Sequence, residues 1–60
     1  MTIINNLSDY YTEYPFLVAR LYDNNWWYWG SYKTHENAAD AARKIGGEVF
    51  RLEEIEEGML

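Results

Sequence analysis

The sequence contains no cysteine, and His35 is the only histidine among its 60 residues. Disulfide bonds and thiolate metal sites are therefore excluded. A chain of this length buries only about 60% of its unfolded surface, so its hydrophobic core is marginal. No Asp/Asn/Gly loop has the spacing of a calcium site. Association is the remaining common source of stability for such a small domain, and we therefore expect a homodimer.

Basic residues and long apolar runs are also scarce. Five Lys and Arg stand against ten Asp and Glu, which gives a net charge of −5. This charge disfavours nucleic acid and acidic lipid as partners and favours a basic protein. No segment approaches the roughly 18 apolar residues of a membrane-spanning helix. The first residues lack the basic start and apolar run of a signal peptide. We expect a cytoplasmic protein without membrane contact.

The first half of the chain predicts a hairpin. Residues 1–14 form an N-terminal segment in which Ser8 is placed to cap a short helix that ends before Pro15. Residues 16–22 and 26–32 are rich in β-branched and aromatic side chains, which favour strands. Asn24 and Asn25 fit a two-residue turn between them, because Asn tolerates positive φ.

The second half predicts a helix and a third strand. Thr34 is a typical helix N-cap, and the Gly46-Gly47 pair is a typical helix end. Apolar residues at helical spacing form one stripe: Ala38, Ala41, Ala42 and Ile45. "EVFRL" reads as a strand, and residues 53–60 form an acidic tail. We find no second domain within residues 1–60.

These elements predict an α+β fold with the order ββαβ. A three-stranded, fully antiparallel sheet with the strand order 2-1-3 and one helix on one face buries the apolar residues economically. The two-residue turn assigns one aliphatic face to the helix: Leu17, Ala19, Leu21, Tyr28, Gly30 and Tyr32, with Phe50 and either Leu52 or Val49 beside them. Side chains of a strand point alternately to the two faces of the sheet. The single predicted helix covers one face, so the opposite face has no helix over it.

The uncovered face is aromatic, and exposed apolar patches commonly mark interaction sites. We predict the dimer interface here, at Phe16, Val18, Tyr22, Trp27 and Trp29, with Arg20 on the same face. A three-residue turn would instead expose Trp26, Tyr28 and Tyr32. Three occupants fit this face: the N-terminal segment with its tyrosines (Tyr10, Tyr11 and Tyr14), a second copy of the chain, or another protein.

No group of residues in this sequence forms a clear catalytic motif. His35 falls at the start of the predicted helix, and the two serines have no evident reason to meet it. The glycine pair precedes a strand, so it is not a phosphate loop. We predict no catalytic residue, metal ligand or cofactor, and hence no enzyme. Aromatic rings on a sheet can stack single-stranded bases, but that function needs a positive groove. The five basic residues are scattered along the sequence and predict no such groove. A binder of single-stranded nucleic acid is therefore kept only as an alternative.

One segment resembles part of a DNA-binding family. The run "GSYKTHENAADAA" with the strand before it, residues 26–45, is similar to the arm-type DNA-binding domains of phage integrases. Those domains are basic, whereas this chain is acidic.

The whole chain resembles a second family, the small acidic inhibitors of uracil-DNA glycosylase from Bacillus phages. The corresponding parts are "LSDYYTEY", "FLVARLYDNNWWYWGSYK", "THENAADAARKI" and "EVFRLEEI". The resemblance implies a homodimeric DNA mimic, with carboxylates in place of phosphates and an apolar pocket for the enzyme's DNA-penetrating leucine.

For such a DNA mimic, the partner-binding carboxylates are expected to be Glu36 and Asp40, which are neighbours at i and i+4 on a helix. The family's helix carries aromatic residues and this one offers alanines, so the pocket must draw on the second strand: Trp27, Tyr28, Trp29 and Tyr32. A protein-interaction module that dimerises through its aromatic face is a second hypothesis. A binder of single-stranded nucleic acid is the third.

Overall fold

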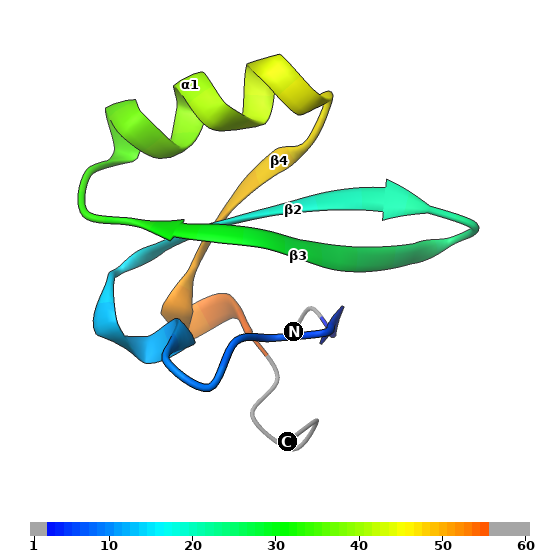
Figure 1. Cartoon of the computed structure of the whole chain (residues 1–60), viewed down its shortest axis with the longest axis horizontal. Helices are drawn as coiled ribbons and strands as arrows, with labels where there is room; N and C mark the ends of the chain where they lie inside the picture. The colour runs from blue at the N-terminus through cyan, green and yellow to red at the C-terminus, as the bar shows by residue number, and fades with distance from the viewer. Residues whose placement is uncertain (1–2, 56–60) are drawn as a thin grey trace.

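The computed structural model describes residues 3–55 and has the predicted α+β class, with one α-helix and one sheet. Figure 1 shows the elements, which are β1 (Ile4–Asn5), η1 (Tyr11–Glu13), β2 (Phe16–Tyr22), β3 (Asn25–Tyr32), α1 (His35–Ile45), β4 (Glu48–Arg51) and η2 (Leu52–Glu54). The elements η1 and η2 are single turns of 3-10 helix. The eleven-residue α1 is the longest helix in the described part of the chain, and no helix there is long and apolar enough to span a bilayer.

The sheet is mixed and has four strands in the order β1-β3-β2-β4. As predicted, β2 lies between β3 and β4 and is antiparallel to both. The prediction of a three-stranded, fully antiparallel sheet was wrong, because β1 pairs with β3 in parallel through Ile4 and Trp26. Two residues are too few to show strand periodicity in a sequence. The strand ends where Asn6 takes a positive φ of 64°.

The hairpin turn is centred one residue earlier than predicted. Asp23 and Asn24 have φ values of 53° and 64°. Positive φ at both central residues is the signature of a type I′ turn, whose twist matches that of the strands. Further along, the pairing shifts by one residue between Val18 and Ala19. Trp29 is therefore an extra residue in β3, which is a β-bulge.

This register corrects the predicted faces. The helix α1 packs on the face of Phe16 and Val18, which was predicted to be open. Val18, Ala38 and Ala42 are buried there together, and Tyr32 joins them. The bulge pairs Val18 with Gly30, whereas the register nearer the turn, continued without it, would pair Val18 with Trp29. It therefore brings Gly30 and Tyr32, which were predicted on the other face, to the face that α1 covers. A Cβ atom on Gly30 would lie 3.1 Å from the Tyr32 hydroxyl oxygen, so the glycine leaves room for the Tyr32 side chain at this point.

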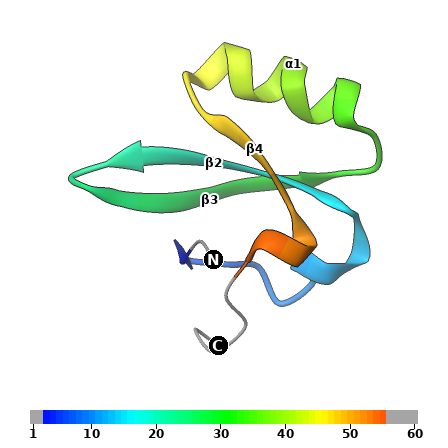
Figure 2. The same ribbon diagram turned by 180° about the vertical axis from the view of Figure 1, so that it is seen from behind.

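The other face of the sheet is covered by the two ends of the described chain (Figure 2). Leu17 and Ala19 form a second buried cluster with Ile4, Tyr11 and Ile55, and Phe50 and Leu52 pack against it. Thus the N-terminal segment does occupy a face of the sheet, and Leu17, Ala19, Phe50 and Leu52 belong to one core face as predicted. That core lies on the side away from the helix.

The two chain ends differ in detail from the predicted ones. The predicted N-terminal helix is only the single turn η1, and the Ser8 hydroxyl oxygen accepts a hydrogen bond from the Tyr10 backbone N–H (3.1 Å). The predicted tail starts within η2, and residues 56–60 lie outside the described residues. The backbone N–H of Leu52 donates to the Pro15 carbonyl (3.1 Å), which joins the two ends.

The link from α1 to β4 generates a stability prediction. A Cβ atom on Gly47 would lie 2.6 Å from the Ala19 carbonyl oxygen, whereas Gly46 has open space and a φ of 71°. We expect Gly47→Ala to lower the free energy of unfolding by about 1–3 kcal/mol through this overlap. The matched variant Gly46→Asn should change it by less than about 0.5 kcal/mol, because Asn accepts the left-handed conformation. Urea denaturation measures both, and equal losses would contradict the register of β4 on β2.

The buried hydroxyl of Tyr11 generates a second stability prediction. It has no hydrogen-bond partner among the described residues. An unsatisfied buried polar group costs about 1–3 kcal/mol. Tyr11→Phe should therefore leave stability unchanged or raise it by up to about 1 kcal/mol. The exposed Tyr10→Phe serves as the control and should have no effect in the same denaturation experiment. A clear loss of stability in Tyr11→Phe would show that the hydroxyl is bonded.

Candidate binding surfaces

An aromatic patch lies at the turn end of the hairpin, on the same face as the helix. It consists of Arg20, Tyr22, Trp27 and Trp29. The hairpin extends past α1 toward its turn, so this end of the face has no helix over it (Figures 1 and 2). Tyr22 is 64% exposed, Trp27 42% and Trp29 55%. Large aromatic side chains seldom lie so open together, and the patch is thus a candidate recognition surface.

Two of the rings are positioned by the backbone. The Trp27 indole N–H donates a hydrogen bond to the Tyr22 carbonyl oxygen (3.2 Å), which fastens the ring across the hairpin end. Trp29 is the bulged residue, and bulges commonly re-aim a side chain. All four patch residues line a hollow of about 260 Å³.

A larger hollow of about 520 Å³ continues from the patch into the angle between β3 and α1. Its walls include Trp29 and Tyr32 from β3, and Asp40, Ala41 and Lys44 from α1. Trp29 lines both hollows, so they adjoin at this residue. The patch and the helix groove therefore form one continuous surface.

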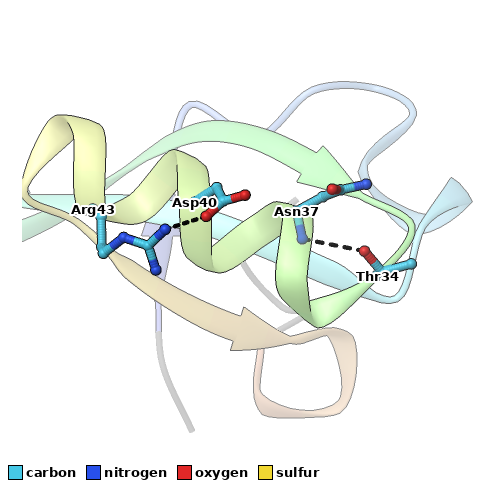
Figure 3. Close-up of polar contacts among 4 residues, drawn as sticks. All are labelled: Thr34, Asn37, Asp40 and Arg43. Carbon is cyan, nitrogen blue, oxygen red and sulfur yellow. Dashed lines mark hydrogen bonds and ion pairs between the residues drawn. The ribbon is translucent and has the colours of Figure 1, made fainter.

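The charges along this groove are set by α1. The Thr34 hydroxyl accepts a hydrogen bond from the Asn37 backbone N–H (3.1 Å), which confirms the predicted N-cap (Figure 3). One turn further on, the Arg43 guanidinium forms an ion pair with the Asp40 carboxylate. Asp40 is thus charge-compensated, while Lys44 has no carboxylate within ion-pair distance among the described residues. The two hollows are lined by two cations, Arg20 and Lys44, and by the single carboxylate of Asp40, which Arg43 compensates.

The opposite side of the sheet is acidic. Residues 6–15 and 52–55 form this layer, and they contain no Lys or Arg. Their exposed carboxylates are Asp9, Glu13, Glu53 and Glu54, which we call the acidic layer. The neighbouring Arg51 forms an ion pair with Glu53 (3.4 Å), and its backbone N–H donates to Glu54 (2.8 Å).

The structure distributes the predicted site residues over several places. Trp27, Trp29 and Tyr22 lie together in the aromatic patch. Tyr32 is half-buried beneath α1, and Tyr28 is half-buried on the other face, where its hydroxyl is hydrogen-bonded to that of Ser31 (2.7 Å). Glu36 is exposed in the first turn of α1, and Asp40 lies one turn along.

Two predicted dimer contacts need correction. Val18 is fully buried under α1, and Phe16 packs half-buried beside it. Neither presents an open face to a second chain, because α1 covers this part of the sheet face.

Sequence reasoning missed the acidic layer and the role of Lys44 beside the patch. The acidic layer unites two segments that are nearly 40 residues apart, so only the tertiary structure assembles it. Lys44 had a signal that could have been used, since it follows Asp40 by one helical turn and must share its side of α1.

Comparisons with protein-family models, curated proteins and solved structures found no match for this chain. Within residues 3–55, no group of three or more His, Cys, Asp or Glu side chains could hold a metal ion. The two surfaces described above are therefore the basis for a functional proposal.

The exposure of the patch can be checked by acrylamide quenching of tryptophan fluorescence. Trp26 is half-buried, with its ring centroid 4.9 Å from that of Phe50. The double variant Trp27→Phe/Trp29→Phe keeps only this indole, and we expect weak quenching of its emission. Trp26→Phe keeps the two patch indoles and should be quenched more strongly. The reverse order would contradict the assignment of the faces.

Proposed function

We propose that the protein is a small non-catalytic binding module whose acidic layer docks on the basic surface of a partner protein. The supporting observation is the segregation of charge. Four exposed carboxylates lie on one side of the sheet, in segments without any basic residue. Carboxylates held on a folded scaffold attract a basic surface, and they raise the rate of association.

An enzyme that binds DNA is the best candidate for such a partner, because its DNA-binding cleft must be basic. The resemblance to the phage inhibitors makes uracil-DNA glycosylase the first enzyme to test. In such a complex the carboxylates would take the positions of DNA phosphates. The predicted pair was Glu36 and Asp40, but Asp40 is compensated by Arg43. The acidic layer offers a larger set, in which only Glu53 has an ion pair among the described residues, with Arg51, and we assign the contact to this layer.

The test is a uracil-excision assay with the protein in excess, combined with variants that remove charge from one side at a time. Asp9→Asn/Glu13→Gln removes two charges from the acidic layer, and neither residue forms an ion pair among the described residues. We expect it to weaken inhibition about tenfold, mainly through a slower association rate.

The matched control removes the same number of charges outside the acidic layer. Asp23→Asn/Glu36→Gln should weaken inhibition by less than about twofold. Full glycosylase activity in excess protein would remove this enzyme as the target. Equal losses in the two double variants would remove the acidic layer as the docking surface.

A further inference from the structure

The groove on the helix side differs in character from the acidic layer. It combines exposed rings with a local excess of positive charge, although the whole chain carries a charge of −5. We propose that this groove, from Trp27 across Trp29 to Lys44, binds single-stranded nucleic acid by stacking bases on its indole rings. It would be a second site, separate from the proposed protein-docking surface, because the two lie on opposite sides of the sheet.

Stacking is the first element of this site. Any nucleobase has a flat aromatic face and can stack on an exposed indole or phenol ring, so this mode of binding tolerates many sequences. The groove offers Tyr22, Trp27 and Trp29 on one side of the sheet, all exposed. The hydrogen bond from Trp27 to the Tyr22 carbonyl already holds one ring in the free protein. A ring that is held before binding loses little conformational entropy when a base stacks on it.

Charge complementarity is the second element, and it selects the occupant. Arg20 lines the smaller hollow and Lys44 the larger one, so each of the two hollows that adjoin at Trp29 has one cation at its border. Asp40 also borders the larger hollow, but its ion pair with Arg43 compensates its charge. A phosphodiester backbone that crosses Trp29 would therefore meet a cation on each side. Glu36 lies at the far end of α1, and Asp23 lies in the turn beyond the patch.

The geometry also distinguishes a single strand from a duplex. In a duplex the bases are stacked on each other, and their faces are not available to a protein ring. The groove is shallow and runs between a strand and one helix, so it fits an unpaired strand whose bases can turn toward the protein. A second copy of the chain could also bring carboxylates of its acidic layer to these cations, and the experiment below distinguishes it from a single strand.

The experiment uses the full chain and a labelled oligothymidine of about 12 nucleotides, followed by fluorescence anisotropy at low salt. We expect binding that weakens steeply as salt is added, because phosphate contacts release counterions. Trp29→Ala should weaken binding about tenfold or more, and Trp29→Phe should restore most of it, because a ring is retained. Arg20→Ala should lower the affinity and also reduce the dependence on salt.

The control is Tyr10→Ala, which removes an even more exposed ring from the opposite side of the sheet and should leave binding unchanged. No binding, equal binding to the matching duplex, or an equal loss in Tyr10→Ala would each overturn the proposal. So would sedimentation showing a dimer that Trp29→Ala dissociates, because a second copy would then occupy the groove. The two proposals fail separately: Trp29→Ala should leave glycosylase inhibition intact, and Asp9→Asn/Glu13→Gln should leave oligonucleotide binding intact.

Discussion

The register of the β2–β3 hairpin is the constraint on which the rest of this structure depends. In a strand, a shift of one residue moves every following side chain to the other face. The bulge at Trp29 makes such a shift inside β3. It leaves Trp27 and Trp29 on the helix side near the turn, and it places Gly30 and Tyr32 on that same side, where Tyr32 packs against the core under α1. One extra residue therefore provides both the docking surface for the helix and the aromatic patch beside it.

The lengths of the elements explain why the patch stays open. A helix of eleven residues is about 16 Å long, whereas a strand of eight residues extends about 26 Å. The helix can cover only part of the hairpin, and its Ala38–Ala42 stripe fixes which part. The bare region is then the turn end, with Arg20 and the three rings. The length of one helix does not limit how much of the other face is covered, because Tyr11 and Ile55 reach the core there from separate segments.

The sequence was sufficient for features that depend on neighbouring residues. The helix bounds followed from the Thr34 cap, the alanine stripe and Gly46, and the antiparallel order of β3, β2 and β4 followed from the connections. The features that failed depend on contacts distant in sequence or on a single inserted residue. The turn at Asp23-Asn24 competes with an equally suitable Asn24-Asn25, and no residue type marks the bulge. That nucleic acid is disfavoured stays a prediction, and it rests on net charge, which contains no information about which charges share a surface.

Two oppositely charged surfaces are compatible in one small protein when salt screens each of them from the other. The helix, the sheet and the acidic layer are stacked along a direction in which the molecule measures 27 Å (Figure 1). At physiological ionic strength the screening length is about 8 Å, so charges on one outer layer act weakly on a ligand at the other. A phosphate in the groove would thus respond to Arg20 and Lys44 far more than to Glu13 or Glu54. At low ionic strength the screening length grows to about 30 Å. The acidic layer would then oppose binding in the groove, so the local excess of cations around Trp29 must outweigh that repulsion for a single strand to bind.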